Sequence, residues 1–109
     1  MKRGDVVLVV VPSDLGRPRP GVIVQADGFG KDLSTVFICP ISSDVHEQLP
    51  LRPVIEAEPS NGLRLRSQIM TDKMIALRRD RVRRVIGHID ASTSEQIDRA
   101  LLVMLGLAQ

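Results

Sequence analysis

Aromatic residues are almost absent from this chain. Only Phe29 and Phe37 occur among its 109 residues, with no tryptophan and no tyrosine. Proteins that read RNA by stacking bases on aromatic side chains, such as RNA-recognition motifs and OB-folds, therefore match it poorly. Hydrophobic residues still make up 43% of the sequence. The core must consist of valine, isoleucine and leucine, a composition that favours strands.

Cysteine and histidine are equally scarce, which removes several classes of site. Cys39 is the single cysteine, so it cannot form an internal disulfide, and the two histidines are far apart in the sequence. This set does not fit the ligand spacing of a zinc site. The sequence also contains neither a P-loop motif nor the G-x-S-x-G elbow of serine hydrolases. We expect no metal and no cofactor.

Long apolar runs and targeting signals are also missing. The apolar run at residues 6–11 is too short to span a membrane, and nothing resembles a signal peptide. The sequence therefore predicts a cytoplasmic protein without membrane association. Its length predicts one domain over residues 1–109.

The positive charge is modest, but arginine supplies most of it. The net charge is +2, with twelve arginines against three lysines. A planar guanidinium suits phosphate and carboxylate, although a biased codon composition would produce the same excess. Five arginines fall within residues 78–84. That run is either a solvated face or a patch for an RNA backbone.

Hydrophobic patterning predicts several strands followed by one helix. We expect turns at residues 27–34 and 58–62, and a turn or 3₁₀ segment at 78–84. The predicted strands cover residues 5–11, 20–26, 35–41, 51–57, 63–69, 74–77 and 85–89.

The period changes to that of a helix after residue 89. Ser92 and Glu95 form a capping-box pattern, and Gly106 marks the predicted end of the helix. The helix is apolar almost all round near residues 101–107, so the sheet or a second subunit must cover it. The fold class is therefore mainly β with a C-terminal α-helix, a small antiparallel barrel or sheet on which the helix packs.

The segment GRPRPGVIV holds the most informative polar residues. Pro18 and Pro20 stiffen the approach to a strand, and each pushes the arginine before it, Arg17 or Arg19, towards extended geometry. Cleavage of RNA through its own 2′-hydroxyl needs a proton acceptor, a proton donor and cations around the phosphorane. Arginine supplies the cation but is a poor base. Arg19 is the main candidate, against the plainer interpretation of a solvated loop charge.

Hydroxyl and amide side chains supply the other candidates. Ser42 and Ser43 follow the strand VFICPI, where hydroxyls often only stabilise a turn. Ser67 and Gln68 lie in the alternating strand, and Lys73 follows in the segment MTDK. Together with Arg17, the residues Ser43, Ser67, Gln68 and Lys73 are the predicted substrate-binding set.

Taken together, these motifs resemble the MazF/PemK (Kid) family of toxins, in the CcdB/PemK-like superfamily. RGDVVLV and RPGVIVQAD resemble the family's opening strands, and VFICPISSD resembles its CPI strand and loop. LRLRSQIMTDKM is similar to its S-x-Q-I segment, with Met70 where the family usually carries arginine. The closing strand and helix, RVIGHIDASTSEQIDRALLVMLGL, complete a resemblance over almost the whole chain.

The resemblance implies a toxin of a type II toxin–antitoxin pair that cleaves single-stranded mRNA at specific sequences without a metal. It implies an SH3-like barrel with a terminal helix, assembled as a homodimer. The family's catalytic arginine falls on Arg19 and its catalytic hydroxyl on Ser42. The implied partner is an antitoxin with an extended acidic segment, which would compete with RNA for Arg17 and Arg19.

Two other interpretations remain open at the level of sequence. A CcdB-like poison would use the same barrel without catalysis and bind DNA gyrase through the end of its helix. A catalytically inactive relative would persist as a binding module, an interpretation that the missing arginine at Met70 favours.

Overall fold

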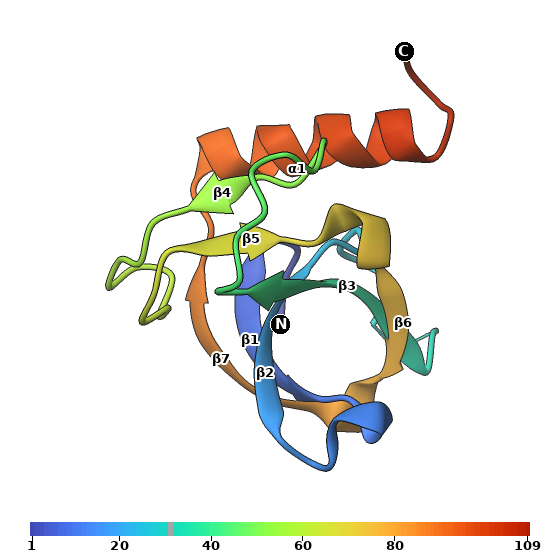
Figure 1. Cartoon of the computed structure of the whole chain (residues 1–109). Coiled ribbons are helices and arrows are strands. Elements are labelled where there is room, and N and C mark those ends of the chain that lie inside the picture. The colour runs from blue at the N-terminus through green and yellow to red at the C-terminus, as the bar shows by residue number, and fades with distance from the viewer. Residues whose placement is uncertain (31) are drawn as a thin grey trace.

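A curled antiparallel sheet and one C-terminal helix form the fold (Figure 1). The structure is a computed structural model that describes residues 1–30 and 32–109. Lys31, within the predicted turn 27–34, lies outside the described residues. The strands of the described chain are β1 (Asp5–Val10), β2 (Pro18–Ile23), β3 (Thr35–Ser42), β4 (Val54–Ile55), β5 (Ser67–Ile69), β6 (Ile75–Arg78) and β7 (Val82–His88). The helix is α1 (Ala91–Met104), and three short 3₁₀ turns are η1 (Pro12–Asp14), η2 (Thr71–Lys73) and η3 (Arg79–Arg81).

Strand β3 is the centre of the sheet. One of its edges pairs with β2, and the other pairs first with β6 and then with β5. The order β4-β5-β3-β2-β1-β7 is antiparallel throughout, with η3 joining β6 to β7. The sheet therefore curls round into the ring of Figure 1, and the predicted fold class is confirmed.

The two prolines of β2 lie where they cost the sheet little. Pro18 and Pro20 pair with Val10 and Leu8 of β1, whereas pairing with β3 begins only at Gly21. One edge of β2 is therefore free along the prolines, the place where a sheet tolerates a missing N–H. For this reason the strand begins at Pro18 rather than at residue 20, and Arg19 lies within it.

The apolar side chains form two clusters on the two sides of the curled sheet. One cluster fills the interior of the curl and includes Val7, Val9, Val36 and Ile38. The other lies between the sheet and α1 and contains Ile97 of the helix. Branched aliphatic residues supply both clusters, as the shortage of aromatics requires.

The helix begins two residues earlier than the capping-box pattern predicts. Asp90, not Ser92, is the N-cap, and its carboxylate accepts a hydrogen bond of 2.8 Å from the backbone N–H of Thr93. That hydrogen bond lowers the pKa of Asp90. Ser92 lies inside the first turn of the helix. At the other end Gly106 has a φ of +75°, so the predicted stop at this glycine is confirmed.

Two of the predicted strands are shorter in the structure. Residues 51–57 contribute only Val54–Ile55, and residues 63–69 contribute only Ser67–Ile69. All three residues of β5 are buried, although the alternation of residues 63–69 predicts one buried and one solvent-exposed face. The arginine-rich run also divides, because η3 ends at Arg81 and β7 begins at Val82.

The end of α1 leaves apolar side chains uncovered. Leu105 and Leu107 are 58% and 72% exposed, although the helical pattern predicts a covered face. Within the described chain, no helix is both long enough and apolar enough to cross a membrane.

Candidate active site

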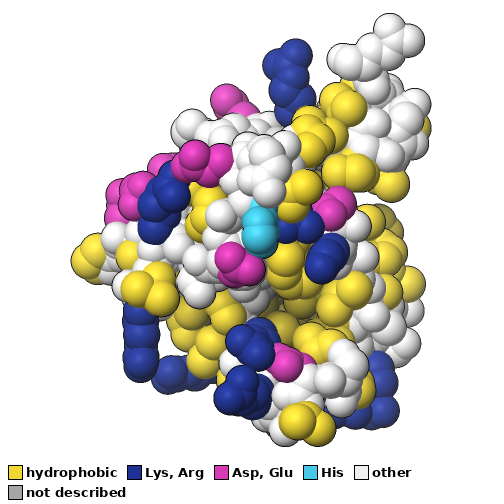
Figure 2. All heavy atoms as spheres, in the orientation of Figure 1, with side chains coloured by type: hydrophobic (Ala, Val, Ile, Leu, Met, Phe, Trp, Pro, Cys, Tyr) yellow, Lys and Arg dark blue, Asp and Glu magenta, His cyan; other side chains and the backbone are white. Residues whose placement is uncertain are grey.

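A groove in the curled sheet brings together most of the polar residues predicted from sequence. Its volume is about 1020 Å³. Figure 2 shows a hollow floored by hydrophobic side chains, with basic and acidic side chains around it. We call it the Arg19 groove; its lining includes Leu8, Asp14, residues 18–20, residues 40–44, residues 62–65, Ser67, Met70, Lys73, Arg84 and Ile86.

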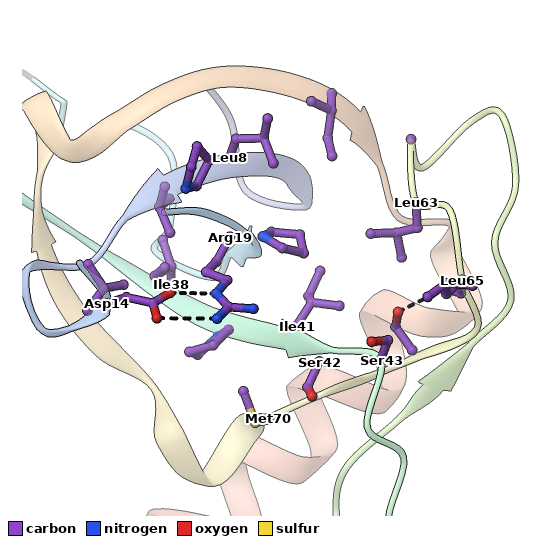
Figure 3. A pocket seen from close by; sticks show the side chains of 18 of the residues that line it. Leu8, Asp14, Arg19, Ile38, Ile41, Ser42, Ser43, Leu63, Leu65 and Met70 are labelled. Carbon is purple, nitrogen blue, oxygen red and sulfur yellow. Dashed lines mark hydrogen bonds and ion pairs between the residues drawn. The ribbon is translucent and has the colours of Figure 1, made fainter. Parts of the chain in front are cut away.

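Arg19 projects into the groove and is held there by Asp14 (Figure 3). Its Nε donates to Asp14 Oδ2 at 2.5 Å, and its Nη2 donates to Asp14 Oδ1 at 3.3 Å. The hydrogen bond lowers the pKa of the Asp14 carboxyl and raises the pKa of the Arg19 guanidinium. Both groups are therefore charged at neutral pH. The carboxylate occupies one edge of the guanidinium and leaves Nη1 for an anion.

Ser42 ends β3 on another side of the same groove (Figure 3). Its Oγ accepts a hydrogen bond of 3.1 Å from the backbone N–H of Asp44. The hydroxyl proton has no acceptor among the residues that the structure describes, so it can be donated to a ligand. Ser43 is exposed and also lines the groove.

Ser67 and Gln68 use their polar atoms within the fold. Ser67 is 4% exposed and its hydroxyl donates to the carbonyl of Leu65 at 2.8 Å. Gln68 is 1% exposed, and its amide bonds both the N–H and the carbonyl of His46, at 3.2 and 3.0 Å. Gln68 thus anchors the loop after Ser42. It does not line the groove, whereas Ser67 does.

The other two predicted substrate-binding residues lie at different places. Lys73 lines the groove, but Arg17 is exposed outside its lining. Met70 also lines the groove, and Figure 3 shows its side chain beside Ser42. The structure therefore brings Arg19, Ser42, Ser43, Ser67 and Lys73 to one groove and leaves Arg17 and Gln68 outside it.

Other reactive side chains near the groove are already engaged. Arg52, 7% exposed, binds Asp72 through two hydrogen bonds of 2.7 and 2.8 Å, which lower the pKa of Asp72. Burial raises the pKa of the Cys39 thiol to about 12, so it is not a nucleophile at neutral pH. Within residues 1–30 and 32–109, no three His, Cys, Asp or Glu side chains are placed to hold a metal ion.

The site residues predicted from sequence leave out four charged residues of the groove, Asp14, Asp44, Arg64 and Arg84. Asp14 carried a usable signal, because it lies five residues before Arg19 on the far side of a loop. Arg84 lies in the arginine-rich run 78–84, which has a patch for an RNA backbone as one interpretation, but only the sheet register singles it out from that run. Arg64 carried no signal, because loop packing brings it to the groove.

Comparison with known proteins identifies the family. Residues 2–105 match the model of the PemK-like, MazF-like toxin of type II toxin–antitoxin systems. The chain belongs to this family. It is 35% identical to a probable endoribonuclease MazF of Mycolicibacterium smegmatis, over 99% of both chains. It is 28% identical to endoribonuclease EndoA of Bacillus subtilis, over 98% of this chain and 96% of the relative.

Solved structures of MazF toxins share the fold. The Mycobacterium tuberculosis toxin MazF-mt6 superposes with a TM-score of 0.82 at 21% identity, covering 96% of this chain and 99% of that one. A mycobacterial endoribonuclease in complex with its cognate antitoxin gives 0.80 at 21% identity, covering 100% and 98%. The family predicted from the motifs is therefore confirmed.

Proposed function

We propose that this PemK/MazF-like chain is an endoribonuclease that cleaves single-stranded RNA at specific sequences, as the toxin of a type II toxin–antitoxin pair. One domain spanning residues 1–109 would carry the activity in the cytoplasm. The observation that carries the proposal is Arg19, fixed by Asp14 in a groove that also receives the Ser42 hydroxyl. The full-length relative at 35% identity, a probable endoribonuclease, supports the same activity.

The proposed reaction is attack of a 2′-oxygen on the adjacent phosphorus. The 2′-O–P bond forms, the P–O5′ bond breaks, and the products are a 2′,3′-cyclic phosphate and a 5′-hydroxyl. One proton leaves the 2′-oxygen and one is gained at the 5′-oxygen, so no water is consumed. Negative charge accumulates on the phosphorane oxygens, where fixed donors stabilise it most.

Arg19 and Ser42 supply those donors in the proposal. The Nη1 group of Arg19 faces the phosphorane oxygens while Asp14 holds the other edge of the guanidinium. The Ser42 hydroxyl donates to a second oxygen, because the Asp44 N–H occupies a lone pair rather than its proton. Asp14 acts as a positioning residue, since its lowered pKa makes it a weak base at neutral pH.

Substrate contacts are proposed for the polar residues around this centre. Ser43 and Lys73 line the groove and face an RNA strand directly. Arg17 lies beyond the lining and would meet the strand as it leaves. Ser67 and Gln68 support the groove instead, because their side chains hold the backbone at Leu65 and His46.

Two protein partners complete the proposal. The uncovered apolar residues at the end of α1, among them Leu105 and Leu107, support a homodimer that buries them. An antitoxin with an extended acidic segment would bind the cations of the Arg19 groove and exclude RNA. One relative of this fold was solved in complex with its cognate antitoxin.

The gyrase-binding alternative is not favoured. The two curated relatives reported above are a probable endoribonuclease and an endoribonuclease, and each is matched over nearly its whole length. A dimer explains the apolar helix end without a gyrase contact.

The interpretation as an inactive binding module depends on Met70. This methionine does not remove the cationic centre, because Arg19 and Lys73 remain in the groove.

The test is cleavage of a long defined RNA in EDTA by the wild-type protein. We expect discrete cuts whose downstream fragments carry a 5′-hydroxyl, detected by labelling with polynucleotide kinase. Intact RNA, with loss of supercoiling by gyrase, would overturn the proposal.

A further inference from the structure

The Arg19 groove continues beyond Arg19 and Ser42, and two more arginines stand on its wall. Arg84 of β7 pairs with Leu8 of β1, and both line the groove. Paired residues of antiparallel strands share a face of the sheet. The strand register and the groove lining therefore both place Arg84 on the face of the sheet that carries Leu8. Arg64 lines the groove from the segment 62–65.

The segment that carries Arg64 is packed against β7. A Cβ on Gly62 would lie 2.3 Å from the carbonyl oxygen of Ile86, so the two backbones are in contact. Arg64 lies two residues after this contact and Arg84 two residues before it. Both arginines therefore belong to one wall. In Figure 3 the neighbours of Arg64, Leu63 and Leu65, lie across the groove from Asp14, with Arg19 between them.

The charges of these two arginines are not neutralised locally. Neither Arg64 nor Arg84 has an ion-pair partner among the residues that the structure describes. The acidic residues of the groove lining are Asp14 and Asp44, which pair with Arg19 and His46. The wall formed with β7 is consequently a cationic surface that faces the groove.

We propose that Arg64 and Arg84 bind phosphates of the RNA strand next to the cleaved bond, along the wall opposite Asp14, a role that rests on the proposed function. The groove of about 1020 Å³ exceeds most pockets for single small ligands, so it has room for several nucleotides. Neither Phe29 nor Phe37 lines it, so base stacking on aromatic side chains contributes nothing there. Phosphate contacts must then supply a large share of the affinity.

The test measures the salt dependence of binding to a fluorescein-labelled 2′-fluoro RNA of mixed sequence, which lacks the attacking 2′-hydroxyl. We expect Arg64→Gln and Arg84→Gln each to reduce the slope of log affinity against log salt by about 0.7, the value for one phosphate of a single strand. Arg83→Gln is the matched control, because Arg83 is an exposed neighbour on β7 outside the groove lining. Its slope should equal that of the wild type. Thermal unfolding shows whether each variant is folded.

A second readout separates this role from catalysis. With cleavable RNA and saturating protein, the single-turnover rates of Arg64→Gln and Arg84→Gln should stay within about threefold of the wild type, while half-saturation moves to higher protein concentration. Slopes equal to that of Arg83→Gln would overturn the inference. So would variants that keep the RNA slope but lose affinity for a polyglutamate peptide, since the wall would then serve an acidic protein partner. Wild-type protein that binds RNA with the expected slopes but never cuts it would refute only the proposed function.

Discussion

Replacement of Asp14 should separate the positioning of Arg19 from its charge. The carboxylate holds the guanidinium through Nε at 2.5 Å and Nη2 at 3.3 Å. The Arg19 side chain is 51% exposed, so few other contacts fix it. In Asp14→Ala the groove gains one net positive charge, but the guanidinium loses both bonds that orient it.

These two consequences act on different kinetic constants. A more positive groove binds RNA more tightly, so the half-saturating protein concentration should fall. Displacement of a catalytic group by about 1 Å costs roughly 100-fold in rate, so the single-turnover plateau should fall about 100-fold in Asp14→Ala. Asp14→Asn keeps one oxygen acceptor for Arg19. Its plateau should fall about tenfold, a proportionate share of the same effect.

The assay is single-turnover cleavage of a short RNA that contains one mapped site, over a range of protein concentrations. Asp44→Asn is the control, because Asp44 also lines the groove but pairs with His46 rather than with Arg19. It should lower half-saturation and leave the plateau unchanged. A plateau that rises or stays constant in Asp14→Ala would refute the positioning role and make Asp14 a competitor of the phosphate.

Further changes test other parts of the structure. Gly62→Ala should destabilise the fold by about 2–4 kcal/mol in urea unfolding, because its φ is +72° and its Cβ would meet Ile86. Gly16→Ala, at φ +78° with open space around it, should cost only about 1 kcal/mol. Gln68→Leu should cost about 2 kcal/mol, since both backbone groups of His46 lose their partner. Met70→Arg should steepen the salt dependence of RNA binding by about 0.7, unlike Ala76→Arg outside the groove. On acidification, the stabilising Asp14–Arg19 pair should persist below the ordinary pKa of aspartate. It should disappear only as the pH falls through the lowered pKa of Asp14. NMR titration of the Asp14 carboxyl measures this loss.

Each of these expectations has a contrary result. Equal stabilities of the two alanine variants would mean that the contact of Gly62 with β7 is unimportant. Gln68→Leu protein of normal stability with weakened RNA binding would restore Gln68 to the substrate contacts predicted from sequence. Equal salt slopes for Met70→Arg and Ala76→Arg would place Met70 away from the RNA. An Asp14 carboxyl that titrates at its ordinary pKa would rule out a persistent pair.

Local patterns predicted the elements whose structure depends on nearby residues. The β-branched run beginning at Asp5 became β1, and the helical spacing around Ile97 became α1. Arg19 was singled out by the prolines on either side of it, and Ser42 by the resemblance of its segment to the family's CPI strand and loop. The helix start was misplaced because Asp90 and Ser92 both suit an N-cap, and it is Asp90 that accepts the hydrogen bond from Thr93.

Features that depend on long-range packing were not predictable from local pattern. Gln68 has a polar side chain, yet it is buried and its amide bonds the backbone of His46, 22 residues earlier in the chain. Arg84 joins the groove because its partner in β1 is Leu8, whereas its neighbour Arg83 does not. A sequence shows five arginines in this run but not which of them shares a face with Leu8.

Cleavage of a long defined RNA in EDTA, by the wild type and by Arg19→Ala, tests the account most directly. The account predicts discrete cuts with 5′-hydroxyl ends for the wild type, and a loss of at least about 1000-fold in rate for Arg19→Ala, comparable to removal of the arginine in other phosphoryl-transfer sites. Cuts that persist unchanged in Arg19→Ala would contradict the assignment of the active site. Wild-type protein that leaves the RNA intact would contradict the proposed activity itself.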